Sequence, residues 1–257
     1  MIARTVQVAY FTIVRKEISR FLRIWQQTLL PPVITTSLYF VIFGNLIGPR
    51  IGEMEGFRYI DFIVPGLILM SVITNAYANV SSSFFSAKFQ RSIEEIQVSP
   101  TPEWVILLGY VTGGMARGLL VGIVVTVVAL LFSRLTVHSI AVMLSVIFLT
   151  AMLFALGGVM NGLFARKFDD VSIIPTFVLT PLTYLGGVFY SINLLPPFWQ
   201  AVSHGNPILY MINGFRYGFL GISDLDLGLS YLIIIAFTIA LFFINLRLLK
   251  AGYGIRN

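Results

Sequence analysis

Cysteine is absent from the sequence, histidine is rare, and charged residues make up only 11% of it. The lack of cysteine excludes disulfide bonds, thiolate catalysis and cysteine-bound metals. His138 and His204 are far apart and neither has a nearby carboxylate, so we predict no metal site. Neither a GxxxxGK(S/T) nucleotide-binding loop nor a GxSxG nucleophile motif occurs. We therefore predict that the chain is not an enzyme and carries no cofactor of its own.

The remaining composition is that of a membrane protein. Of the 257 residues, 57% are hydrophobic and the mean hydropathy is +0.89, whereas soluble domains carry about 25% charged residues. A membrane-spanning helix needs about 20 mainly apolar residues, and six runs meet that length. We predict an all-α polytopic membrane protein that forms one transmembrane domain over residues 1–257, with spans at about 29–49, 62–84, 107–132, 139–163, 171–190 and 228–248.

The distribution of basic residues predicts the orientation of these spans. If the N-terminus is cytoplasmic, most of the 17 lysines and arginines fall on the cytoplasmic side, as the positive-inside rule requires. Six spans then return the C-terminus to the cytoplasm. The net charge of +6 is therefore a topology signal, and we expect membrane lipids but no nucleic acid among the partners.

Residues 5–25, ahead of the first span, have the pattern of an amphipathic helix. Projected on a helical wheel, the apolar side chains share one side and the basic ones share the other. Such a helix lies at the membrane interface, either as a plain topology anchor or as a docking element. Glu17 is the exception, because it projects on the apolar side. Pairing with Arg20, one turn on, is favoured over contact with a partner protein.

Two of the predicted spans carry polar stripes. Side chains at helical spacing make up these stripes: Ser71, Asn75, Asn79 and Ser82 on the second span, and Thr176, Thr180 and Thr183, followed by Tyr184, on the fifth. Asparagine in hydrocarbon is costly unless it finds a partner or a wet cavity. The stripes therefore form interhelical hydrogen bonds or line a path, and we favour a path for a bulky amphipathic solute. An ion or proton relay would need acidic groups, which neither stripe contains.

Glycines at four-residue spacing predict close helix packing in the third and fourth spans. They are Gly114, Gly118 and Gly122, then Gly158 and Gly162. Arg117 lies among the glycines of the third span. Because that apolar run is longer than one span needs, we expect Arg117 to snorkel to lipid head groups; a buried functional arginine is the alternative.

The loop 88–103 has the pattern of a short helix between two spans. Phe85, Phe89, Ile93 and Ile96 recur at helical spacing, with Glu94 and Glu95 beside them, and Ser99-Pro100 ends the helix. This helix is either a structured turn or a coupling helix that docks in a cytosolic partner. Apolar side chains beside acidic ones favour docking.

Residues 171–217 combine a span with a broken apolar segment. Pro196, Pro197 and Pro207 interrupt the second part, and Gly205 and Asn206 precede the last of these prolines. A segment so apolar is no ordinary solvated loop, and one so interrupted is no straight span. We predict a re-entrant helical hairpin over 192–213 that dips back into the outer side of the membrane.

These features together resemble the permease subunit of an ABC type-2 exporter. The resemblance rests on the N-terminal helix, the six spans, an E-E-x-x-x-S-P coupling loop and the stretch LPPFWQAVSHGNPILYMINGFR. Its most family-specific residues are Leu195-Pro196-Pro197, Trp199, Asn206-Pro207 and Arg216. The similarity covers essentially the whole chain and is greatest to short bacterial inner-membrane permeases that work with a separate ATPase subunit.

The resemblance implies partners and roles. It implies a multi-pass protein of the bacterial inner membrane, assembled as a homodimer with two ATPase subunits that bind ATP and Mg²⁺. It places the second and fifth spans along the central path. It assigns ATPase coupling to Glu17, Phe89, Arg91, Ile93, Glu94, Glu95, Ser99 and Pro100, and the outer hairpin and gate to Phe189, Tyr190, Pro196, Pro197, Trp199, Asn206, Pro207 and Arg216.

The function that follows is ATP-driven export of an amphipathic or bulky solute, such as a glycan, a lipid-linked compound or a drug-like molecule. An ATPase-independent channel or lipid scaffold is the main alternative. A membrane-bound transferase is disfavoured, because its nearest acidic pair, Asp169-Asp170, is flanked by Arg166 and Lys167 and suits a charged cytoplasmic loop.

Overall fold

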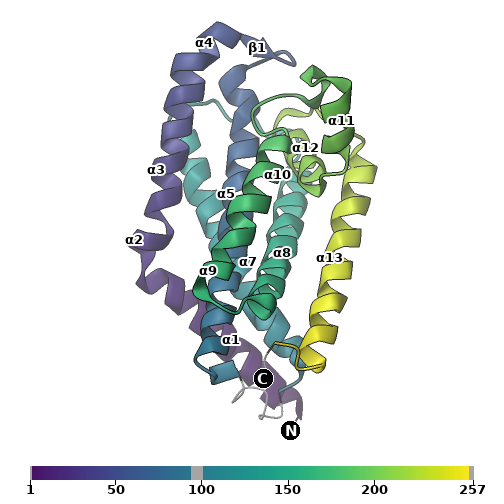
Figure 1. The fold of residues 1–257 in the computed structure, drawn as a ribbon. Coiled ribbons are helices and arrows are strands. Elements are labelled where there is room, and N and C mark those ends of the chain that lie inside the picture. Colours follow the sequence, from purple (N-terminus) through teal and green to yellow (C-terminus); the bar gives the residue numbers. More distant parts are fainter. Residues whose placement is uncertain (1, 94–100, 255–257) are drawn as a thin grey trace.

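The computed structural model describes residues 2–93 and 101–254, and within them the chain is almost entirely helical. The helices form a long bundle with both chain termini at one end, the inner end (Figure 1). The elements are α1 (Ile2–Arg23), α2 (Trp25–Thr28), α3 (Leu30–Tyr39), the π-helix η1 (Phe40–Ile47), α4 (Gly48–Ile51), β1 (Glu53–Met54), β2 (Phe57–Arg58), α5 (Tyr59–Phe89), α7 (Glu103–Ala129), α8 (Ile140–Phe164), α9 (Phe168–Ile174), the π-helix η2 (Pro175–Leu179), α10 (Thr180–Leu185), the 3-10 helix η3 (Ile192–Leu194), α11 (Pro197–His204), α12 (Pro207–Leu220) and α13 (Leu227–Lys250).

Five helical stretches in the described residues are long and apolar enough to cross a membrane. They are Trp25–Ile51, Tyr59–Phe89, Glu103–Ala129, Ile140–Phe164 and Leu227–Lys250. Each coincides with one of the six predicted spans. Proline at the start of α3 fits the first of them, because the missing N–H has no partner in a first helical turn.

Helix α5 is the centre of the bundle. Of the residues in the most apolar 18-residue stretch of α5, 78% are buried. The corresponding fractions are 11% for Trp25–Ile51 and 17% for α13. Helices α7 and α8 pack against α5, and α1 packs against α7. The first and last spans therefore lie at the periphery, where their apolar side chains face the surroundings.

Glycines allow this close packing, as the sequence predicted. A Cβ on Gly158 of α8 would lie 2.6 Å from the backbone oxygen of Tyr77 in α5, and one on Gly118 of α7 would lie 3.1 Å from that of Val72. A side chain at either position would force the helices apart, since the Cβ at Gly118 would also lie 2.8 Å from the Cβ of Ala76. The glycine series of α7 and α8 therefore bring both helices onto α5.

The predicted fifth span differs from the other five. Residues Phe168 to Leu185 form α9, η2 and α10 in succession and run from the inner end toward the opposite, outer end (Figure 1). Helix α10 ends at Leu185, short of the predicted 190, because the chain turns at Gly186 and Gly187 has φ of +79°. The wide turn of η2 begins at Pro175, which has no N–H for the regular helical bond.

Helix α5 also departs from the predicted limits. It continues to Phe89, so Phe85 and Phe89 belong to the second span rather than to a separate coupling helix. Arg91, with φ of +59°, turns the chain after it. Glu94, Glu95, Ser99 and Pro100 lie outside the described residues.

At the outer end the interrupted segment folds into short helices. Pro197 and Pro207 are the first residues of α11 and α12, positions that tolerate proline. Asn206 caps α12 by accepting a hydrogen bond from the N–H of Ile208 at 3.0 Å. Helix α12 continues to Leu220, beyond the predicted end of the hairpin at residue 213.

The turn before α9 provides a test of pH dependence. The carboxylate of Asp170 accepts hydrogen bonds from the backbone N–H groups of Arg166, at 2.8 Å, and Lys167, at 3.0 Å. These donors hold the pKa of Asp170 below its ordinary value. Because the pKa is lowered in the folded state, the stabilisation is complete above the unfolded pKa of about 3.9 and is lost as the pH falls through the folded pKa.

We expect Asp170→Asn to lower the thermal unfolding midpoint at neutral pH. The difference from the wild type should vanish only once the pH falls below the lowered folded pKa of Asp170, where the wild-type carboxyl is neutral too. Asp169→Asn is the matched control, since the carboxylate of Asp169 accepts no hydrogen bond from the described residues. Melting curves across the acid range in detergent measure both variants. A pH-independent deficit in Asp170→Asn would contradict the assignment.

Candidate functional site

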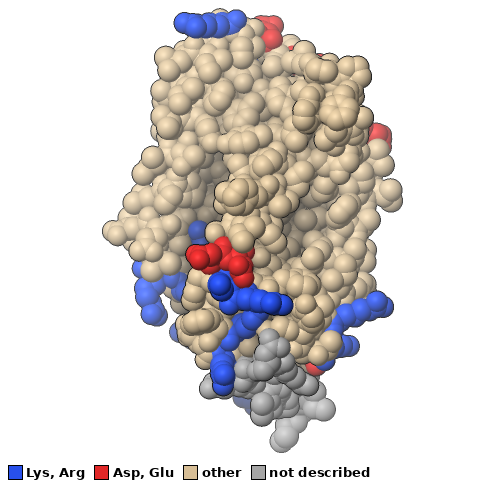
Figure 2. All heavy atoms as spheres, in the orientation of Figure 1, with Lys and Arg blue, Asp and Glu red and all other residues tan. Residues whose placement is uncertain are grey.

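A cavity with a mainly apolar wall and a few polar side chains lies between α3, α5 and α7. Its volume is about 310 Å³. The space-filling surface is hollowed between α3 and the α9–α10 segment, and basic side-chain atoms show at the lower end of the hollow (Figure 2). The cavity is lined by Gln27, Pro31, Pro32, Thr35, Thr36, Tyr39, Leu67, Met70, Ser71, Thr74, Asn75, Ala78 and Arg117.

The polar stripe of the second span divides between two environments. Ser71 and Asn75 line the cavity. Asn79 is fully buried, and its side-chain oxygen accepts a hydrogen bond from Arg20 of α1 at 2.8 Å. Ser82 donates to the carbonyl of Ala78 on its own helix at 2.7 Å. The outer half of the stripe therefore faces a cavity, whereas in the inner half Asn79 makes the interhelical hydrogen bond of the alternative interpretation and Ser82 bonds only to its own helix.

The stripe of the fifth span also divides. Thr176 and Thr180 are exposed on the surface, whereas Thr183 is buried and donates to the carbonyl of Leu179. The hydroxyl of Tyr184 lies 3.1 Å from that of Tyr39, which lines the cavity. This tyrosine pair is where the α9–α10 segment meets the cavity wall.

Arg117 corrects a prediction. It does not reach head groups: it points into the bundle, lines the cavity and donates from Nη2 to Oδ1 of Asn75 at 3.0 Å. The packing of α7 on α5 explains this, because both neighbouring glycines, Gly114 and Gly118, face α5 and carry Arg117 toward the same side. Arg117 is half-buried, a position closer to the alternative of a buried arginine than to snorkelling.

A second polar cluster joins α1 to α5. The carboxylate of Glu17 is fully buried, accepts a hydrogen bond from Ser83 at 2.6 Å and forms an ion pair with Arg20 at 3.3 Å. The predicted local pairing is thus confirmed. A Cβ on Gly113 of α7 would collide with Glu17, so α1 sits in a glycine-lined groove. Glu17 therefore contacts the bundle interior and not an exposed surface.

The inner ends of α5 and α8 are joined by Lys88, which the sequence analysis did not single out. Its Nζ donates to the carbonyls of Leu163 at 2.7 Å and Ala165 at 2.6 Å, at the C-terminal end of α8. Phe89 is exposed and its ring packs on that of Phe168, at the start of α9, with centroids 5.0 Å apart. Of the other predicted coupling residues that are described, Arg91 is exposed and Ile93 is buried.

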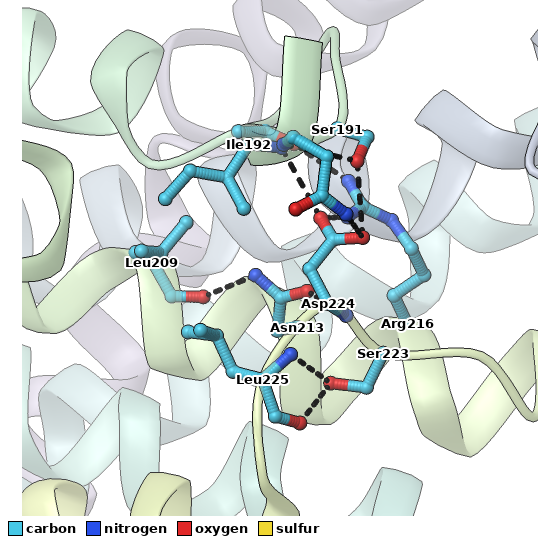
Figure 3. Close-up of polar contacts among 10 residues, drawn as sticks. Ser191, Ile192, Leu209, Asn213, Arg216, Ser223, Asp224 and Leu225 are labelled. Atoms are coloured by element: carbon cyan, nitrogen blue, oxygen red, sulfur yellow. Dashed lines mark hydrogen bonds and ion pairs between the residues drawn. The ribbon is translucent and has the colours of Figure 1, made fainter. Parts of the chain in front are cut away.

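At the outer end, Arg216 is buried rather than part of an exposed gate. Its Nη2 donates to the carbonyl of Gly187 at 2.6 Å, its guanidinium lies 3.9 Å from the ring centroid of Phe62, and Nη1 lies 3.9 Å from the carboxylate of Asp224. Figure 3 shows the carboxylate of Asp224 between Arg216 and the turn at Ser191 and Ile192, whose hydroxyl and N–H donate to it. This outer cluster fixes the turn after α10 to α12.

The remaining predicted gate residues fall into two groups. Phe189 packs on Tyr39 and Tyr184, and its carbonyl accepts a hydrogen bond from Tyr59. Tyr190 is half-buried, which raises the pKa of its phenol. The exposed group lies on and before α11 and comprises Pro196, Pro197 and Trp199. Pro207 is half-buried beside the buried cap Asn206, whose amide donates to the carbonyl of Leu182.

Comparison with known proteins identifies the family of this chain. A family model described as ABC-2 type transporter matches residues 8–220. The chain belongs to the ABC-2 type transporter family. This agrees with the resemblance drawn from the residues themselves.

Relatives of this ABC-2 transporter protein extend the match to nearly the full chain. The inner membrane transport permease YadH of Escherichia coli K12 is 62% identical over 250 residues, which are 97% of this chain and 98% of that protein. Nodulation protein J of Rhizobium meliloti is 26% identical over 214 residues, which are 83% and 82% of the two chains. With its long apolar helices, this chain is therefore a multi-pass protein of the inner membrane.

Family membership bears on the role of the whole chain. Members of this family are transport permeases, which supports a role in transport rather than catalysis, and they typically work with an ATPase partner. Within the described residues no group of histidine, aspartate and glutamate is arranged to hold a metal ion.

Proposed function

We propose that this chain is the membrane-spanning permease of an ATP-driven exporter and forms the path for an amphipathic or bulky solute. It acts as a homodimer with two ATPase subunits, its termini are cytoplasmic, and ATP and Mg²⁺ bind to the partner. The observation that carries the proposal is the cavity between α3, α5 and α7, which combines an apolar wall with a few polar side chains, in a chain of this family.

Orientation follows from charge. Lysines and arginines gather mainly at the inner end of the visible face in Figure 2, which also holds both termini (Figure 1). Under the positive-inside rule that end is cytoplasmic. The segment Phe168–Leu185 then serves as the fifth of six spans, with Asp169 and Asp170 at its cytoplasmic end.

In this arrangement α11 and α12 form the re-entrant hairpin on the outer side. Phe198 and Trp199 of α11 are 69% and 46% exposed, which suits aromatic side chains at a membrane interface. The tyrosine pair Tyr39–Tyr184, covered by Phe189, is placed to gate the outer end of the path.

Coupling to the ATPase enters at the inner end. We assign the ATPase contact to the loop 88–103 and to the exposed basic face of α1. The cluster of Glu17, Arg20 and Asn79 would transmit movement of α1 to α5, which forms one wall of the cavity. ATP binding would draw the two permeases' inner elements together and open a path between them.

The decisive experiment is purification of the tagged chain from its native membrane in mild detergent. We expect a nucleotide-binding ABC subunit to co-purify and native mass spectrometry to give two copies of each chain. Reconstituted in liposomes, the complex should hydrolyse ATP. A chain that purifies alone and conducts solutes without ATP would instead be a channel, the alternative function.

Substitution with tryptophan tests the path itself. Asn75→Trp should fill the cavity and abolish most ATP-dependent release of a fluorescent acyl amphiphile from proteoliposomes. Thr180→Trp should reduce this release if the fifth-span stripe borders the path. Leu232→Trp is the matched control, because Leu232 is 66% exposed on the peripheral helix α13. Wild-type release by Asn75→Trp, with normal assembly, would mean that the stripe only packs helices.

A further inference from the structure

We propose that the cavity between α3, α5 and α7 binds one acidic amphiphile, a molecule with a single anionic head group on an apolar body, and that Arg117 holds the head group. The inference deepens the proposed function by naming the class of solute, and its transport rests on that function. The binding itself depends only on residues of this chain.

The charge at the cavity is unbalanced. Arg117 forms no ion pair with any carboxylate among the described residues, and no acidic residue lines the cavity. Glu17, the acid of the neighbouring polar cluster, is already paired with Arg20. An unpaired cation within a membrane span is costly, so a bound anion would offset that cost.

The guanidinium of Arg117 has hydrogen-bonding capacity to spare. Asn75 accepts one hydrogen bond from Nη2, and Nη1 donates to none of the described residues, whereas Nε is buried and out of a ligand's reach. Asn75 is itself fixed, because its amide nitrogen donates to the carbonyl of Ser71 at 2.9 Å. A planar guanidinium held on one side in this way presents its free donors to a carboxylate or phosphate, which it binds in bidentate fashion.

The rest of the cavity suits an apolar body. Pro31, Pro32, Leu67 and Met70 form apolar parts of its wall, while the hydroxyls of Thr36 and Ser71 lie near each other at 3.4 Å. The volume of about 310 Å³ lies at the lower end of the range of small-molecule sites, roughly 300–1,000 Å³. Leu67 and Met70 precede Asn75 on α5, so the apolar body would extend from Arg117 toward the outer end.

Binding to the purified, delipidated chain without any ATPase tests the inference. Native mass spectrometry would follow titration with palmitate or hexadecanol, and with dioleoyl phosphatidylglycerol or dioleoyl phosphatidylcholine. We expect one acidic ligand per chain, bound at least about tenfold more tightly than its neutral counterpart, as one charge-assisted contact allows. A preference for palmitate identifies a free acidic amphiphile as the ligand, and a preference for phosphatidylglycerol identifies a membrane lipid.

Variants test the contribution of the Arg117 charge to binding separately from that of the cavity space. Arg117→Gln should reduce acidic binding to the neutral level, and Arg117→Lys should keep part of the preference. Arg247→Gln, the same change at the inner end of α13, should bind like the wild type. Thr74→Trp fills the exposed rim of the cavity with Arg117 intact and should weaken both classes of ligand, which tests the site even if Arg117→Gln does not fold.

Equal binding of acid and alcohol by the wild type, or wild-type binding by Arg117→Gln, overturns the inference. Because no ATPase is present, failure to bind is distinct from failure of the proposed exporter. A chain that binds palmitate through Arg117 but assembles with no ATPase would retain this site and lose only the transport role.

Discussion

Replacement of Arg216 by methionine is expected to destabilise the protein by about 3–5 kcal/mol, the loss typical of a broken buried ion pair. The side chain of Arg216 is 1% exposed and that of Asp224 is 8% exposed. Methionine fills similar space and keeps the contact with Phe62, but it leaves the carbonyl of Gly187 without its donor and Asp224 without a cation. Hydrogen bonds from Ser191 and Ile192 to Asp224 remain and place the effect toward the lower end of that range.

Arg58→Met is the matched control for this substitution. Arg58 also pairs with an aspartate at the outer end, Asp61, but its side chain is 57% exposed. Exposed ion pairs contribute about 0–1 kcal/mol. Unfolding in mixed micelles of dodecyl maltoside and SDS, followed by tryptophan fluorescence, compares the two variants. Equal losses would mean that Arg216 is solvated in the folded protein.

A double variant sharpens the same test. Asp224→Asn removes the charge that Arg216→Met leaves unpaired, so the combined variant should lose less stability than the sum of the two single changes. Strict additivity would show that the two charges, 3.9 Å apart, do not interact.

The substitution Gly158→Ala should destabilise the bundle by about 1–3 kcal/mol, the range for overpacking a well-packed interior. The added methyl would lie 2.6 Å from the backbone oxygen of Tyr77 and 3.1 Å from the backbone nitrogen of Ser81. Backbone atoms of the central helix cannot move aside as the end of a side chain can. Helix α8 must therefore shift away from α5.

The adjacent residue supplies the control. A Cβ on Gly157 would meet only the ring of Tyr77, at 3.5 Å, an ordinary van der Waals distance. Gly157→Ala should therefore leave stability unchanged or raise it by up to about 1 kcal/mol through helix propensity. The same micelle titration measures both variants. A loss in Gly157→Ala as large as in Gly158→Ala would contradict packing as the cause.

Features that depend on local sequence were predictable. Apolar runs located five long helices, and glycines such as Gly118 and Gly158 located the packing faces, because a missing side chain is itself the signal. The limits of the fifth span were not predictable from hydropathy. Gly186 and Gly187 are compatible with an apolar run, and only the left-handed backbone at Gly187 shows that the helix has ended.

Features that depend on partners distant in sequence were missed. The direction of Arg117 is set by Asn75 on another helix, and the burial of Arg216 depends on the carbonyl of Gly187, 29 residues before it. A single charged residue in an apolar run indicates a constraint, but not whether lipid, water or another helix satisfies it. A second sequence signal was available for Arg216, because Asp224 is a nearby acid of opposite charge.

Lys88 has a mechanical consequence. Because its ammonium group donates hydrogen bonds to the last carbonyls of α8, it couples the inner end of α5 to the short turn that leads into α9. Asn161 strengthens this connection by donating to the carbonyl of Val171 at 3.0 Å. A force applied by a partner to the inner tip of α5 would thus reach the α9–α10 segment over a few bonds, without first deforming the centre of the bundle.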